Sequence, residues 1–467
     1  MSETLSNEMV NRFISDGCLQ IQSDLPEEYH SNICNKVDKA VGNGNPGNNL
    51  LPIIPEITEV FKDPKIAGAL ETLLGPDYLM HPHRYCHVNR VSSDGQNWHK
   101  DDYIFDQNTR RPRFRWLIAF YYPHDVNEGS GPSATLPGQH YYNNISSANP
   151  PDTTEEEYLL CGKGGTINLL NFDAWHRATP NLGSDRRIMI KFNFQRVSDP
   201  CPKGFAPTSE NSTEQHPLVT RDVENWLRGL NNPATTIDTS TNFQQVESNH
   251  EAQEIDSAYL RASKGNISSL MDDMVRIATK NPALRIATSS ANPQGRNPSE
   301  FAAALALGSV GDGVISHLRA ALEDSHWAIR ATAADILGDI GPRASSSVKQ
   351  IVDLLSDREV WVRRNAAEAL AHIGIEDGAF EKEIASALKD PDHRVRRNVA
   401  YAWIASPQSH NTAINALAQA LRDDDRYVQF NTLEALKRSS SEQAHKILCD
   451  NLMTSRWCPS TSTDNPY

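Results

Sequence analysis

The first 200 residues contain four short β-rich runs, each eight to eleven positions long and bounded by turn residues. They lie at 83–91, 114–123, 165–172 and 187–197. Short runs without regular helices between them are typical of an antiparallel sandwich or barrel. Helical patterns precede these runs at 31–41 and 63–74 and follow them at 216–230. We therefore expect a β-rich domain with helices packed on its outside.

From about residue 255 the pattern becomes helical, and from about 320 it repeats. Aspartates recur at a constant spacing of 33 residues, as Asp324, Asp357, Asp390 and Asp423. An arginine stands six residues after each of the first three, as Arg330, Arg363 and Arg396, whereas Gln429 occupies this place in the fourth. Each unit predicts two helices around a tight turn, too small to bury its apolar face except against the next unit.

The repeated stretch, about 300–455, resembles short HEAT repeats, with a first unit that lacks the aspartate. A period of 33 also fits ankyrin repeats, but the TPLH turn of that family does not occur. We interpret the aspartates and arginines as links between neighbouring repeats, and not as catalytic groups.

A polar stretch separates the two regions. Residues 231–252 are rich in Asn, Gln, Ser and Thr and show no hydrophobic period, which is typical of a linker or loop. We predict a β-rich domain at 1–230, a polar linker at 231–254, a helical repeat domain at 255–457 and a tail at 458–467.

The overall charge excludes some classes of partner. Lys and Arg total 45 against 59 Asp and Glu, a net charge of −14, which disfavours binding to nucleic acid or anionic membranes. No run approaches the ~18 apolar residues that a membrane helix requires, and the start lacks the layout of a secretory signal. Seven scattered cysteines form no CxxC pair. We expect a soluble, cytoplasmic protein with reduced thiols.

One triplet in the β-rich region carries candidate chemistry. His99 and Asp101 form the only H-x-D of the chain, and His176 follows 75 residues after the aspartate. Two imidazoles and one carboxylate on one face of iron(II) leave three adjacent positions free, as in non-haem oxygenases. A 2-oxoglutarate co-substrate would fill two of them and O2 the third. We expect His99 and Asp101 where a strand runs into a loop, and His176 on a distant strand.

The far carboxylate of that co-substrate requires a buried cation, and arginine supplies two parallel hydrogen bonds. Arg187 lies eleven residues after His176 and shares a strand face with Met189, Lys191 and Asn193. Arg186 would point the other way, so only one of the two enters the site. Arg187 is the better candidate, with Arg186 as the alternative.

Residues 10–230 resemble the phytanoyl-CoA dioxygenase family of iron(II)- and 2-oxoglutarate-dependent oxygenases. The matching elements are the opening MVNRFISDGCLQI, the W-H-x-D ending at Asp101, the N-x-G and LPGQH at 127–140, GGTINLLNF before WHRATPN, and Arg187. The family usually has LPGSH where this chain has LPGQH. The resemblance implies a double-stranded β-helix, or jelly roll, with flanking helices. It implies His99, Asp101 and His176 as iron ligands and Arg187, Gln96 and Trp116 at the co-substrate.

The expected function is hydroxylation of an unactivated C–H bond in a small-molecule metabolite or natural product, with release of succinate and CO2. Retention of Asp101 favours hydroxylation over halogenation, because related halogenases lose this carboxylate; desaturation, epoxidation and ring formation stay open. The alternative is an interaction scaffold with a regulatory or inactive oxygenase-like domain. The repeats are expected to bind a protein partner, to self-associate, or to cap the barrel.

Two further groups of residues are assigned ordinary roles. His81, His83 and His87 are expected to be barrel residues on an alternating strand. A basic run follows the metal motif, and we expect it in a lid loop that is either solvated or faces an anionic substrate. This run consists of Arg110, Arg111, Arg113 and Arg115.

Overall fold

The computed structural model describes residues 3–42, 44–101, 103–104, 106–142, 157–200, 216–230, 250–280, 297–375, 380–407 and 413–454. Within these ranges the strands form two antiparallel sheets. The larger has the order β1-β6-β3-β8-β2, with β1 at Cys18–Gln22, β6 at Thr166–Asn171, β3 at Trp116–Tyr122, β8 at Arg187–Gln195 and β2 at Leu79–Asn89. The smaller has the order β5-β4-β7, with β5 at Tyr158–Leu160, β4 at Ser133–Thr135 and β7 at His176–Ala178. The four predicted β-rich runs overlap β2, β3, β6 and β8, as expected.

Residues of β8 point alternately to the two faces of the larger sheet, and each face packs against a different core. Ile188, Ile190 and Phe192 belong to a core shared with the flanking helices, whereas Met189 belongs to a separate core on the other face. Arg187 and Lys191 share the face of Met189, because alternate residues of a strand point to the same side. The flanking helices are α1 (Asn7–Asp16), α2 (Glu27–Gly42), α3 (Leu50–Ile53), α4 (Ile57–Val60), α5 (Pro64–Leu74) and α6 (Pro217–Leu227).

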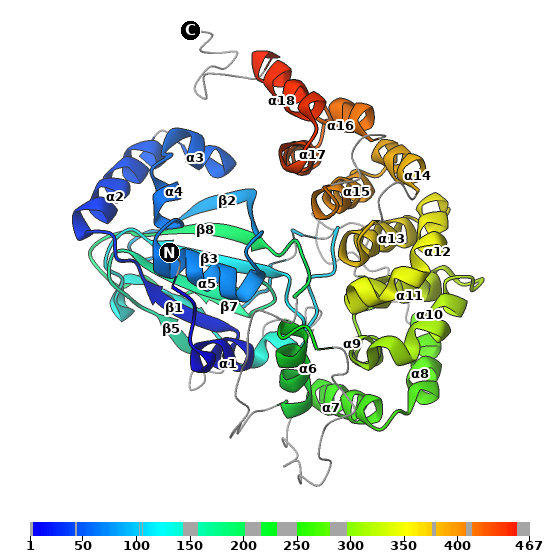
Figure 1. Ribbon diagram of the computed structural model, residues 1–467. Helices are drawn as coiled ribbons and strands as arrows, with labels where there is room; N and C mark the ends of the chain where they lie inside the picture. The colour runs from blue at the N-terminus through cyan, green and yellow to red at the C-terminus, as the bar shows by residue number, and fades with distance from the viewer. Residues whose placement is uncertain are drawn as a thin grey trace.

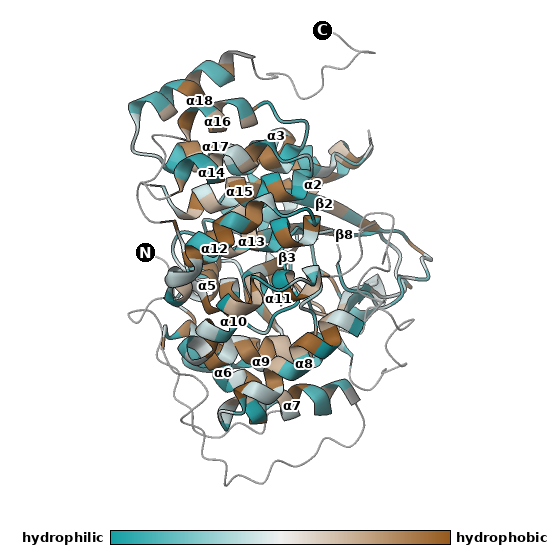
Figure 2. Ribbon diagram, turned by 90° about the vertical axis from the view of Figure 1, so that its right-hand side faces the viewer, coloured by the Kyte–Doolittle hydropathy of each residue, from teal (hydrophilic) through white to brown (hydrophobic). Residues whose placement is uncertain are grey.

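The C-terminal half is a curved array of helix pairs. Its helices are α7 (His250–Ser263), α8 (Ile267–Lys280), α9 (Ala302–Val310), α10 (Ile315–Ala321), α11 (Trp327–Ile340), α12 (Val348–Asp353), α13 (Val360–Ile373), α14 (Glu381–Ser386), α15 (His393–Ala405), α16 (Ile414–Ala420), α17 (Arg426–Arg438) and α18 (Glu442–Thr454). Figure 1 shows this array as an arc around one side of the N-terminal domain, with α11, α13, α15 and α17 on its inner side. Figure 2 shows the pairs stacked in chain order from α7 at one end to α18 at the other.

The predicted links between repeats are present. Arg363 donates two hydrogen bonds to Asp390 of the next repeat, at 2.7 and 3.1 Å, and a third to the carbonyl oxygen of Asp357 in its own repeat, at 2.9 Å. The same arrangement joins Arg330 to Asp357 and Arg396 to Asp423. At the fourth place, the side chain of Gln429 donates to the Asp423 carbonyl of its own repeat and, among the described residues, forms no link to a further unit. The series of links therefore stops there.

The predicted domain limits are partly described. Helix α7 begins at His250, so the last residues of the predicted linker 231–254 are helical. The rest of that linker and the predicted tail 458–467 lie outside the described residues. Within the described ranges, no helix combines the length and apolar character needed to cross a membrane. The five cysteines in those ranges are all unpaired.

The basic run corrects the prediction of a solvated or substrate-facing lid. Its four arginines are only 2 to 8% exposed. Arg111 forms ion pairs with Asp335 and Asp339 of α11, and Arg115 donates to Asp339 at 2.8 Å. These carboxylates come from the repeat array more than 200 residues away in the chain. Arg111, Arg113 and Arg115 of the run therefore form ion pairs that join the sheet domain to the array.

Candidate metal centre

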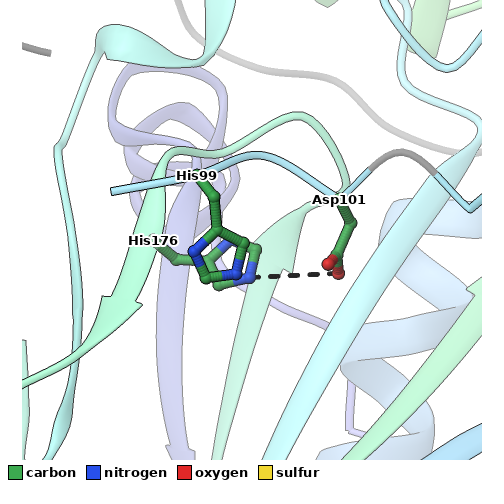
Figure 3. A group of neighbouring side chains, drawn as sticks. All are labelled: His99, Asp101 and His176. Atoms are coloured by element: carbon green, nitrogen blue, oxygen red, sulfur yellow. Dashed lines mark ion pairs between the residues drawn. The ribbon is translucent and has the colours of Figure 1, made fainter. Parts of the chain in front are cut away.

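The two predicted histidines are brought together by the backbone. The N–H of His99 donates to the carbonyl of His176 at 3.1 Å, and the N–H of His176 donates back at 3.0 Å. This isolated antiparallel bridge places both imidazoles on the same side, with ring centroids 4.5 Å apart. Asp101 lies two residues after His99 and projects toward the same space (Figure 3). Instead of the strand end expected at His99, the structure has this single bridge.

The side chains of the three residues form a compact donor set. One potential ligand atom from each lies within 4.8 Å of the other two, and His176 Nε2 is 3.9 Å from Asp101 Oδ2. Each histidine places Nδ1 against a backbone carbonyl, at 2.9 Å for His99 with Asn97 and 3.0 Å for His176 with Ala174. A Nδ1–H donated to a carbonyl leaves the Nε2 lone pair free for a metal. The set fits iron(II), which favours two imidazoles and one carboxylate.

The charges at the site favour metal binding at neutral pH. Burial lowers the pKa of His176 to about 4, so its imidazole is neutral. Burial alone would raise the pKa of Asp101, but the ammonium of Lys191 and the two imidazoles hold this pKa well below its usual value. Lys191 Nζ donates to Asp101 Oδ2 at 3.1 Å. The carboxylate is therefore ionised, and both groups are in the protonation states that a metal requires.

Two cations that were not predicted at the site, Lys100 and Arg110, lie beside the donor set and share the carboxylate of Asp173. Lys100 points away from the ligands and pairs with Asp173 at 2.8 Å. Arg110 also pairs with Asp173, and its Nη2 donates to the carbonyl oxygen of Asp101 at 3.1 Å. The H-K-D pattern contained a signal for Lys100, because a residue between two ligands on an extended segment must face the opposite side.

A cavity of about 560 Å³ opens at the candidate metal centre, and Arg187 lines this cavity. Arg187 is 1% exposed, and its Nε donates to the carbonyl of Gly131 at 2.9 Å. Burial lowers the pKa of Arg187, and its Nη2 has no hydrogen-bond partner among the described residues. Arg186 instead lies on the surface, paired with Asp38. A buried guanidinium with an unused N–H group fits the carboxylate of a co-substrate.

Of the two other residues predicted at the co-substrate, one lines the cavity and one does not. Gln96 lines the cavity, and its Oε1 accepts from the N–H of Ala178 at 3.2 Å. Trp116 does not line the cavity; its Nε1 donates to Gln107 Oε1 at 2.8 Å, deep in the core. Of the three neighbouring histidines, His87 lines the cavity, whereas His81 and His83 contact Tyr427 of the array.

Two family models match this chain, one in the sheet domain and one in the array. Residues 32–189 match the family model described as phytanoyl-CoA dioxygenase (PhyH). Residues 315–381, 348–437 and 381–457 match the model of HEAT repeats. No curated protein matches the chain.

Three solved structures illustrate what the sheet domain is similar to. The non-heme monooxygenase ThoJ, as a nickel complex, is 14% identical over 47% of this chain and 95% of its own, with a TM-score of 0.33. The alpha-ketoglutarate-dependent carbocyclase SnoK from nogalamycin biosynthesis is 16% identical over 46% and 97%, with a TM-score of 0.35. HygX from Streptomyces hygroscopicus, with nickel and 2-oxoglutarate bound, is 15% identical over 42% and 88%, with a TM-score of 0.35.

The family model spans His99, Asp101 and His176 and ends within β8, just past Arg187. The repeat model begins at α10, the helix before α11. Residues 32–189 therefore form a domain similar to the phytanoyl-CoA dioxygenase family, and residues 315–457 form HEAT repeats.

Proposed function

We propose that this chain is an iron(II)- and 2-oxoglutarate-dependent dioxygenase that hydroxylates an unactivated C–H bond of a small molecule, releasing succinate and CO2. One observation carries the proposal. The donor set of His99, Asp101 and His176 opens onto the same cavity as a buried, incompletely paired Arg187. The three donors could hold a metal ion, and Arg187 could bind an anionic co-substrate in the same cavity.

The residues would divide the work as follows. His99, Asp101 and His176 would hold iron(II), which when bound supplies oxidation coupled to decarboxylation of 2-oxoglutarate. Arg187 would bind the far carboxylate of the co-substrate through two parallel N–H groups. Met189 is buried beside the donor set and would limit water at the reacting groups. Because Asp101 is retained, no ligand position is left for a halide, which favours hydroxylation.

We also propose that the two antiparallel sheets are the two sides of a jelly roll. The metal triplet supports this arrangement, because His176 begins β7 of the smaller sheet whereas Lys191, which holds Asp101, belongs to β8 of the larger one. The proposed units are the oxygenase domain at 1–230 and the repeat domain at 255–457. The inner face of the array is occupied by the chain's own basic run, which supports its role as a cap on the oxygenase domain.

Anaerobic addition of iron(II) and 2-oxoglutarate tests the proposal. The full chain should develop the weak visible absorption of a metal-to-ligand charge transfer, and His176→Ala should lack it while keeping its far-UV circular dichroism. Succinate release, followed over a panel of small molecules, would then identify the substrate class. A wild-type protein that develops no absorption with both additions would contradict the proposal.

A further inference from the structure

We propose that Tyr427, in the last described repeat, is a positioning residue for the metal ligand Asp101. This inference rests on the proposed iron site. The repeat array would then be a structural part of the catalytic unit, and not only a platform beside it. The connection runs from Tyr427 through three packed side chains, His83, Tyr103 and Lys191.

The first step joins the array to β2. The Tyr427 hydroxyl is hydrogen-bonded to Nδ1 of His83, across 344 positions of the chain. Arg426 Nη2 donates to the same hydroxyl at 3.0 Å, so the hydroxyl hydrogen itself is available to His83. The guanidinium of Arg397 lies 4.6 Å from the centre of the Tyr427 ring. These contacts fix the tyrosine, and through it the orientation of the imidazole.

The second step reaches the metal ligand. The His83 ring stacks on Tyr103, with centroids 4.2 Å apart and planes 15° from parallel. The Tyr103 hydroxyl donates to Asn193 Oδ1 at 3.1 Å, and the ammonium of Lys191 lies 4.6 Å from the centre of the ring. The same ammonium donates to Asp101 at 3.1 Å. Tyr103 is thus held between His83 and the cation that orients the carboxylate.

The array also holds the segment that follows Asp101. Arg397 Nη1 pairs with Asp106 at 3.2 Å, and Asn398 Nδ2 donates to the Asp106 carbonyl at 2.6 Å. Two residues further, the N–H of Asn108 donates to Glu368 at 2.9 Å. Ordering a chain segment costs conformational entropy, and here the contacts that offset this cost come from α13 and α15. The array therefore holds the chain at Asp106 and Asn108, shortly after Asp101.

Tyr427→Phe in the full chain tests the inference, because it removes only the hydroxyl. We expect the dissociation constant for cobalt(II), measured by calorimetry without 2-oxoglutarate, to rise on the order of three- to tenfold, the usual effect of one hydrogen bond. The unfolding temperature should stay close to that of the wild type. Tyr401→Phe is the matched control: its hydroxyl donates to the Arg196 carbonyl at the same interface, away from the donor set. It should leave the cobalt affinity unchanged.

His83→Phe provides a second route, since it keeps an aromatic ring against Tyr103 but cannot bond Tyr427. If Tyr427 acts through His83, the two single variants should weaken cobalt binding equally, and the double variant no further. Equal effects of Tyr427→Phe and Tyr401→Phe, or no effect of either, would overturn the inference and leave the proposed function standing. A wild-type chain that binds no cobalt at a site removed by His176→Ala would instead overturn the proposed function.

Discussion

Asp339 is the carboxylate whose removal should affect the domain interface most. It lies on α11 and is paired with Arg115 at 2.8 Å, Arg111 at 3.0 Å and Arg113 at 3.7 Å. Asp339→Asn keeps the shape of the side chain and removes its charge, so three buried guanidiniums lose a shared partner. Breaking a buried ion pair from one side costs about 3–5 kcal/mol.

The lower end of this range applies, because each arginine keeps a second carboxylate, Asp335, Asp222 or Asp199. We expect a loss of about 3 kcal/mol in the free energy of unfolding. Over 467 residues the entropy of unfolding is about 1 kcal/mol/K, so the unfolding temperature should fall by about 3 °C.

The loss should also depend on pH. Burial would raise the pKa of Asp339, but the three guanidiniums hold it well below its ordinary value of 3.8. A depressed pKa in the folded state gives stability that is present above the unfolded value and is lost as the pH falls below it. The difference between the wild type and Asp339→Asn should therefore be constant at neutral pH and shrink below about pH 4.

Differential scanning calorimetry measures the shift, and hydrogen exchange of peptides covering 106–116 locates it. Asp312→Asn is the matched control, because Asp312 is 66% exposed and meets Arg343 at 3.5 Å. An exposed pair contributes about 0–1 kcal/mol, so this variant should unfold close to the wild type. If Asp339→Asn unfolds at the same temperature as the control, the buried charges do not hold the interface.

Three further outcomes are expected. Arg187→Lys should weaken 2-oxoglutarate binding to the cobalt-loaded chain by about tenfold, because lysine cannot donate two parallel hydrogen bonds to a carboxylate. Arg186→Lys is the control and should leave this affinity unchanged. Calorimetry measures both affinities, and equal losses would contradict the assignment of Arg187 to the co-substrate. Burial raises the pKa of Glu368 from 4.5 to about 7, so the wild type should lose on the order of 3 kcal/mol of stability as the pH rises through this window. Glu368→Gln should lack that slope in unfolding temperatures measured between pH 5 and 8, and an unchanged slope would refute the cause. Arg363→Ala breaks the link to Asp390 and should lower the free energy of unfolding, measured by thermal unfolding, by about 1–3 kcal/mol. The cobalt affinity should not change, and weaker cobalt binding would contradict the purely structural role of Arg363.

Sequence patterns predicted the strand, the links between repeats and the donor set, because each of these follows from a regular spacing of residues. The alternation in 187–197 identified β8 and the face that carries Arg187. The 33-residue spacing identified the links between repeats, because each unit meets the next in the same way. The spacing of His99, Asp101 and His176 placed three donors that the fold brings together.

Contacts between the two halves could not be predicted in this way. Asp335 and Asp339 look like ordinary polar positions on a helix, and nothing local shows that Arg111 fills the inner face of the array. Trp116 shares its strand face with the cavity residue Phe120, but four strand residues span about 13 Å, which places it beyond the cavity. Lys191 could be placed on the correct face, but its pairing with Asp101 required the fold.

The fit of the array against the oxygenase domain constrains how many helix pairs the chain can have. Free-standing solenoids gain or lose units readily, because each unit contacts only its neighbours. Here α11, α13, α15 and α17 each meet a different point on the sheet domain, from Arg111 to His83. One helix pair inserted between α11 and α17 would move Tyr427 by the length of one repeat, so that it could no longer contact His83. The number of units is therefore set by the width of the sheet domain that the array curves around (Figure 1).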